Sequence, residues 1–162
     1  MLGVHSSLSQ SYLSKRIILI MWLNARKAIL ESSEQSSIYI GCDSLRIPKK
    51  NKADFSTVII LHKDSRHGCL AFHNKVTIPD YGQMRPRLLM EVHYALEAFY
   101  AIEDVVGDRR LEIHLDVNPD PRHASNVVTN EALGWVRGLG IEARIKPDSF
   151  AATTAADHFV RH

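Results

Sequence analysis

The chain has 162 residues, of which 45% are hydrophobic and 23% are charged. These values exclude an intrinsically disordered chain and are typical of one globular domain with a full core. The formal net charge of +2 permits a nucleic-acid partner but does not require one. Cys42 and Cys69 form no CxxC pair and no disulfide ladder, which predicts a protein of the reducing cytoplasm.

The N-terminal part of the chain is predicted to be a leader followed by a helix. Residues 1–12 are rich in serine, and we expect a loose leader there, with a single domain over 13–162. Apolar residues at helical spacing predict a helix over 13–32. Its apolar run, 17–23, is far shorter than the ~20 residues that span a bilayer, so we expect no membrane contact and no export signal.

Three strands are predicted next. Residues 38–43 alternate apolar and other side chains and end on Asp43. Residues 55–63 and 69–78 are separated by a tight turn, which favours an antiparallel hairpin. The basic loop 46–52 leaves the strand that carries Asp43, and we weigh a solvated loop evenly against a phosphate contact.

The second half of the chain alternates between helices and strands. The pattern predicts helices over 86–102, 122–137 and 150–161, and strands over 111–116 and 141–145. A hairpin followed by a β-α-β unit indicates an α/β domain with a mixed sheet. The right-handed crossover rule places the fourth strand beside the first.

Asp43 and Asp116 each stand at the end of an alternating strand. Either residue alone is most simply an aspartate that starts a turn. If the two strands are parallel neighbours, however, the carboxylates emerge together, and such a pair shares a proton or a metal ion. Glu91 lies on the flank of the apolar face of helix 86–102, where it can reach the sheet; the alternative is an ion pair with Arg87.

Asp157, in the predicted terminal helix, is a fourth acid with a plausible place at the same site. Ligands that are all oxygen indicate a hard cation, Mg²⁺ or Mn²⁺. Two such ions can activate a water and stabilise the leaving oxygen of a phosphodiester displacement.

Five short segments carry a resemblance to a known superfamily. They are 41–44 (Gly-Cys-Asp-Ser), 87–92 (Arg-Leu-Leu-Met-Glu-Val), 114–116 (His-Leu-Asp), 145–149 (Ile-Lys-Pro-Asp-Ser) and 155–157 (Ala-Ala-Asp). Together they resemble the ribonuclease H-like superfamily and, more narrowly, its YkuK family, over roughly residues 35–162. The resemblance implies a five-stranded sheet of order 3-2-1-4-5 with strand two antiparallel to the rest, flanked here by an extra N-terminal helix.

The resemblance also implies roles for the four acids. Asp43, Glu91, Asp116 and Asp157 would be the catalytic residues and the ligands of two Mg²⁺ or Mn²⁺ ions. The fourth position varies between Asp and His in the superfamily, and His158 is adjacent to Asp157.

The chain departs from typical family members at two places. Cys42 stands where threonine is more usual, and residues 118–123 replace a Gly-rich loop. The first change lies inside the core and is expected to be harmless. The second lies beside the site and bears on the choice of substrate.

These features predict a divalent-metal-dependent nuclease, with a non-catalytic nucleic-acid-binding module as the alternative. A nucleotide-hydrolysing relative is disfavoured because no Gly-rich phosphate loop follows Gly41. The substrate stays open between RNA–DNA hybrid, branched DNA and single strands, and a homodimer is possible. We expect nucleic-acid contacts from basic side chains near the strand ends, although for Lys146 an ordinary edge-strand charge is slightly favoured; these residues are Lys49, Lys50, Lys52, Arg85, Arg87 and Lys146.

Overall fold

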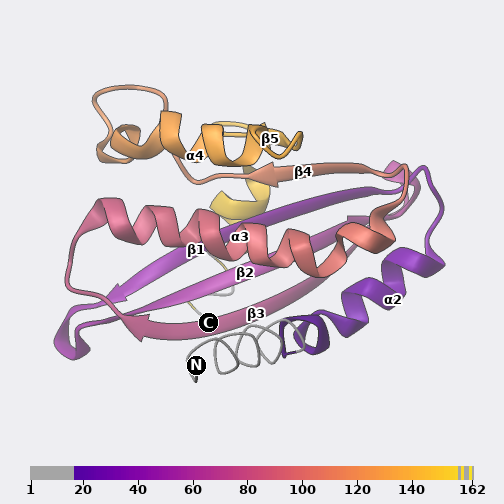
Figure 1. Cartoon of the computed structure of the whole chain (residues 1–162), viewed down its shortest axis with the longest axis horizontal. Helices are drawn as coiled ribbons and strands as arrows, with labels where there is room; N and C mark the ends of the chain where they lie inside the picture. Colours follow the sequence, from indigo (N-terminus) through magenta and orange to yellow (C-terminus); the bar gives the residue numbers. More distant parts are fainter. Residues whose placement is uncertain (1–16, 157, 159–160, 162) are drawn as a thin grey trace, which may run out of the picture.

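The computed structural model describes residues 17–156, 158 and 161, and its centre is a five-stranded sheet (Figure 1). The sheet has the order β3-β2-β1-β4-β5. β2 pairs antiparallel with β1 and β3, whereas β4 pairs parallel with β1 and β5. The predicted strand order and directions are therefore confirmed. The strands are β1 (Ser37–Ile47), β2 (Lys52–His62), β3 (Cys69–Pro79), β4 (Arg110–His114) and β5 (Glu142–Arg144).

Helices flank the sheet, as expected. The α-helices are α2 (Leu23–Glu31), α3 (Met84–Val106) and α4 (Thr129–Arg137). The shorter helical segments are η1 (Pro48–Lys50), η2 (Lys63–Ser65), η3 (Ala124–Val128) and η4 (Ala151–Ala156), of which η4 is a π-helix. Across the described part of the chain, no helix has the length and apolar character that a membrane crossing needs.

The two faces of β1 meet different partners because its side chains alternate. Ile38, Ile40 and Cys42 are buried in the main core, which the long helix α3 covers. Tyr39 belongs to a smaller cluster on the opposite face, where η4 packs against β1 and β2. In Figure 1 α3 crosses one side of the sheet and the yellow η4 segment lies behind β1. β1 and β2 therefore lie between α3 on one face and η4 on the other.

The first strand is longer than the sequence pattern predicted. The prediction ended it at Asp43, but β1 continues to Ile47 because it pairs with β2 along its whole length, from Ser37 with His62 to Ile47 with Lys52. Asp43 therefore lies inside a strand and not at a turn. The alternative that Asp43 simply starts a turn is therefore wrong.

Other bounds differ by a few residues. Helix 86–102 extends to Val106, since Val105 and Val106 are buried in the core. The helix predicted over 122–137 divides into η3 and α4, and the last strand shrinks to three residues. The N-terminal helix is interrupted at Trp22, and the predicted leader, 1–12, lies outside the described residues.

Candidate functional site

Asp43 and Asp116 lie at the same level of neighbouring parallel strands. The pairing of β1 with β4 ends with Gly41 opposite His114, and each aspartate is two residues further along its chain. Because strand side chains repeat every two residues, Asp43 shares a face with Gly41. Beyond β4 the backbone stays anchored, since Leu115 N–H donates to Arg144 O at 2.8 Å. The two acids therefore stand where β4 ends beside the continuing β1.

Glu91 comes from α3, which covers the face of the sheet opposite Asp43, and it is the third acid near the end of β4. It is only 6% exposed, and Ser44 Oγ donates a hydrogen bond to its Oε1 at 2.5 Å. Burial raises the pKa of Glu91 well above its ordinary value, and the negative charges of Asp43 and Asp116 raise it further. The hydrogen bond from Ser44 and the charge of Arg87 oppose this rise. The three carboxylates thus lie within electrostatic reach of one another across the seam between helix and sheet.

The two aspartates also have partners within the chain. Asp43 Oδ1 accepts a hydrogen bond from the Ser44 backbone N–H at 2.8 Å. Asp116 Oδ1 is screened from solvent and lies 2.8 Å from Lys146 Nζ, which balances its charge. Lys146 therefore contacts an acid of the site. The sequence alone had suggested only a phosphate contact or an ordinary edge-strand charge for this residue.

The side chains near the end of β4 have the chemistry that a hard divalent cation prefers. All three acids provide oxygen, and the buried Ser56 hydroxyl opposite Asp43 has no hydrogen-bond partner among the described residues. Within the same residues, however, no three acidic, histidine or cysteine side chains are gathered closely enough to hold an ion. The oxygen atoms of these side chains fit a divalent cation by their chemistry, but the described side chains do not by themselves form a complete binding site.

The fourth predicted acid, Asp157, lies outside the described residues, and its neighbour His158 is exposed. The segment that leads to it is nevertheless fixed on the sheet. The Ala151 backbone N–H donates to His114 Nδ1 at 3.1 Å, and the Phe150 ring packs against Tyr39 and His114. Burial lowers the pKa of His114, so this buried anchor is neutral at physiological pH. The C-terminal segment is thus held over the sheet face that carries Asp43.

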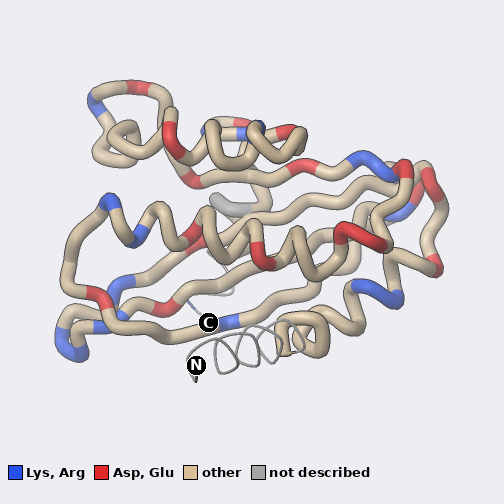
Figure 2. Tube along the Cα trace, in the orientation of Figure 1, with Lys and Arg blue, Asp and Glu red and all other residues tan. Residues whose placement is uncertain are grey.

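The predicted nucleic-acid contacts fall into two groups. Lys49, Lys50 and Lys52 surround the β1–β2 turn, are exposed and have no ion pair among the described residues. Figure 2 shows Lys and Arg gathered at this end of the sheet, beside the start of α3. By contrast, Arg85 pairs with Glu131 at 2.5 Å and Arg87 with Asp80 at 3.7 Å.

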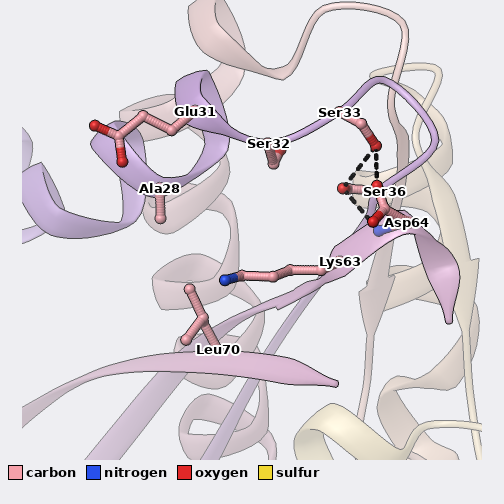
Figure 3. Close-up of a pocket in the computed structure, with 8 residues that line it drawn as sticks. All are labelled: Ala28, Glu31, Ser32, Ser33, Ser36, Lys63, Asp64 and Leu70. Carbon is pink, nitrogen blue, oxygen red and sulfur yellow. Dashed lines mark hydrogen bonds between the residues drawn. The ribbon is translucent and has the colours of Figure 1, made fainter. Parts of the chain in front are cut away.

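A separate hollow of about 430 Å³ lies at the other end of β1 (Figure 3). Ser33 Oγ donates to Asp64 Oδ1, and the Asp64 backbone N–H donates to Ser36 Oγ at 3.0 Å. These groups therefore satisfy one another, and the hollow shares no lining residue with the carboxylate site.

Sequence reasoning missed Ser44, Ser56 and the pair of Arg46 with Asp80. Ser44 had a usable signal, because it follows Cys42 by two residues and so faces α3. Ser56 and Asp80 had none, since only strand pairing brings Ser56 opposite Asp43 and only the fold brings Asp80 to Arg46.

Comparison with known proteins agrees with this geometry. The family model described as Ribonuclease H-like matches residues 23–161. The chain belongs to the ribonuclease H-like family. It is also similar to the uncharacterised protein YkuK of Bacillus subtilis (strain 168), with 29% identity over 154 residues, covering 83% of this chain and 86% of the relative. The resemblance to the YkuK group is thereby confirmed. No solved structure matches the chain. Membership of the ribonuclease H-like family indicates a function related to nucleic acid.

Proposed function

We propose that this ribonuclease H-like protein is a divalent-cation-dependent nuclease that hydrolyses phosphodiester bonds of nucleic acid. The observation that carries the proposal is Glu91, which is buried although the charges of Asp43 and Asp116 both act on it. Burying a carboxylate beside two others is costly unless a proton or a cation compensates. A pure phosphate-binding protein has no use for such an arrangement, whereas a metal-dependent hydrolase needs it.

Each side chain has a definite task in this proposal. Asp43, Glu91 and Asp116 hold Mg²⁺ or Mn²⁺, and Asp157 completes the ligand set. When bound, these ions lower the pKa of water and neutralise the charge that develops on the phosphate. Ser44 fixes the orientation of Glu91 through its hydrogen bond. Lys146 balances the charge of Asp116 and would be able to approach a phosphate once a cation bound that carboxylate.

The second candidate is a nucleic-acid-binding module without catalysis. One observation favours it: Lys146 Nζ lies 2.8 Å from Asp116 Oδ1, so the chain itself balances the charge of that acid. The nuclease hypothesis accounts better for the buried carboxylate of Glu91, because Lys146 compensates Asp116 alone.

The experiment that separates the two uses labelled RNA–DNA hybrid, duplex DNA, single strands and a four-way junction, each with Mg²⁺, Mn²⁺ or Ca²⁺. We expect cleavage with Mg²⁺ or Mn²⁺, and binding without cleavage with Ca²⁺, whose larger radius and looser coordination misplace the attacking water. Binding without cleavage under Mn²⁺ would establish the binding module instead. Size-exclusion chromatography with light scattering tests the homodimer that junction resolution requires, and fractionation of the source cell tests the cytoplasmic location.

Replacing Asp43 by asparagine is expected to weaken Mn²⁺ binding strongly. Asparagine keeps the shape and the oxygen that accepts the Ser44 N–H, but it removes a charge from the site. Isothermal titration calorimetry of both proteins with Mn²⁺ measures the difference. Equal affinities would show that Asp43 is not a ligand.

Neutralising Lys49, Lys50 and Lys52 together is expected to weaken nucleic-acid binding and to flatten its dependence on salt. These side chains are exposed and unpaired among the described residues, so each is available to a phosphate. For every lysine that binds a phosphate, its neutralisation should lower the slope of log affinity against log salt by roughly 0.7–0.9. An unchanged slope would remove the β1–β2 turn from the interface.

A further inference from the structure

A buried aspartate joins two arginines beside the carboxylate site. Asp80 is 8% exposed, with Arg46 Nε at 3.1 Å and Arg87 Nη1 at 3.7 Å from its Oδ2. Its backbone N–H donates to Asn51 O at 2.8 Å, which ties it to the β1–β2 turn. We call Arg46, Asp80 and Arg87 the arginine clamp. Its net charge is positive, because one carboxylate faces two guanidinium groups that stay protonated.

The arginine clamp lies next to the carboxylate site, because its two arginines come from the same helix and strand as Glu91 and Ser44. Arg87 precedes Glu91 by four residues on α3, which is about one helical turn of ~5.4 Å. Arg46 follows Ser44 by two residues on β1, so both side chains lie on the face that α3 covers, ~6.8 Å apart along the strand. Burial dominates the raised pKa of Glu91, and the charge of Arg87 opposes it, so Arg87 lies within electrostatic range of Glu91.

Both guanidinium groups pair electrostatically with Asp80 and keep N–H donors for a further ligand. Each carries five N–H donors in a planar fork, and only the pairing with Asp80 is found for them within the described part of the chain. A Cβ at Gly82, whose φ is +86°, would lie 2.6 Å from Arg46 Nη2 and 2.9 Å from its Cζ. Gly82 therefore leaves the space in which the Arg46 guanidinium lies.

A small hollow and an exposed tyrosine adjoin the arginine clamp. A hollow of about 110 Å³ adjoins the clamp and is lined by Asp80, Tyr81 and Arg87 among others. The Tyr81 side chain is 82% exposed, and an exposed ring beside fixed cations is suited to stacking a base whose phosphate the cations hold.

We propose that the arginine clamp binds the backbone phosphate next to the one that is cleaved and so sets the position of the nucleic-acid strand. This proposal rests on the proposed nuclease function. Forked Arg donors hold a phosphate through two parallel hydrogen bonds, which lysine cannot do. Asp80 is a positioning residue, because it fixes both arginines and would not itself touch the phosphate.

The test measures binding of fluorescein-labelled oligothymidylate by the full chain in EDTA, so that no cleavage enters. Arg46→Lys and Arg87→Lys should each weaken binding about tenfold while leaving the salt slope unchanged, because the charge is kept and the fork is lost. Arg46→Ala should also lower the slope by roughly 0.7–0.9. Inorganic phosphate, added as competitor, should displace the oligonucleotide only weakly if the strand and not free phosphate is the ligand.

Two matched controls separate contact from folding. Arg26 pairs with Asp104 near the far end of α3, and its side chain is 19% exposed, against 18% for Arg87. Arg26→Lys should leave affinity unchanged. Gly82→Ala displaces the Arg46 guanidinium but keeps its charge, so it should weaken binding as Arg46→Lys does. Gly68→Ala, with φ of +74° and no atom within 4 Å of the new Cβ, should not.

The outcomes for the clamp and for the nuclease are distinct. Wild-type affinity in Arg46→Lys, Arg87→Lys and Gly82→Ala overturns the clamp even if Mn²⁺-supported cleavage is observed. Equal losses in Arg26→Lys overturn it too, since they would reflect folding, and so does efficient competition by inorganic phosphate. Selective loss of binding without cleavage of any substrate supports the clamp and refutes the nuclease.

Discussion

Replacing Asp116 by asparagine is expected to reduce Mn²⁺-supported cleavage by roughly 100-fold or more. Side chains that only orient a ligand residue are already worth about 10–100-fold, and a direct ligand should cost at least as much. Nucleic-acid binding should stay intact or become tighter, because a negative charge that faces the phosphate is gone and Lys146 loses its partner. Single-turnover cleavage and equilibrium binding, measured on the same preparation, give both quantities.

Glu97→Gln is the matched control for this experiment. Glu97 lies on α3 like Glu91, but its side chain is partly exposed and pairs with His93 at 3.4 Å. Its replacement should leave cleavage unchanged. Cleavage that survives Asp116→Asn would assign the activity to another site or to a contaminant, and the assignment of the acids would be wrong.

Replacing Glu91 by glutamine is expected to stabilise the cation-free protein at neutral pH. Burial, reinforced by Asp43 and Asp116, raises the pKa of Glu91 well above its ordinary value in the folded state. At low pH the group is protonated in both states and contributes nothing. As the pH rises past the ordinary pKa, the unfolded chain releases its proton first, so the free energy of unfolding falls until the folded pKa is passed. Glutamine keeps the oxygen that accepts the Ser44 hydroxyl and removes this penalty.

The measurement is the urea midpoint of wild type and Glu91→Gln in EDTA, from mildly acidic to mildly alkaline pH. The difference between the proteins should grow with pH, and Mn²⁺ should stabilise the wild type more than the variant. Glu103→Gln, an exposed substitution on the same helix, should show neither effect. A difference independent of pH would mean that Glu91 is not the titrating group.

The sequence by itself predicted the sheet and the positions of three acids relative to it. Alternation in 38–43 and 111–116 identified two strands, and the crossover rule made them parallel neighbours, which brings Asp43 and Asp116 to one level. The helical spacing of α3 placed Glu91 at the seam with the sheet, where it is buried. These inferences succeed because the periods of 2 and 3.6 residues are local properties of the backbone, and burial follows them.

Element bounds and the partners of each charge were decided only by tertiary structure. β1 passes Asp43 because β2 offers hydrogen bonds as far as Ile47, a fact that no local pattern carries. Lys146 lies on Asp116, and Asp80 joins Arg46 to Arg87, since folding brings together segments that are far apart in sequence. An ion pair depends on the distance between two atoms in space, and sequence spacing fixes that distance only within one helix or strand.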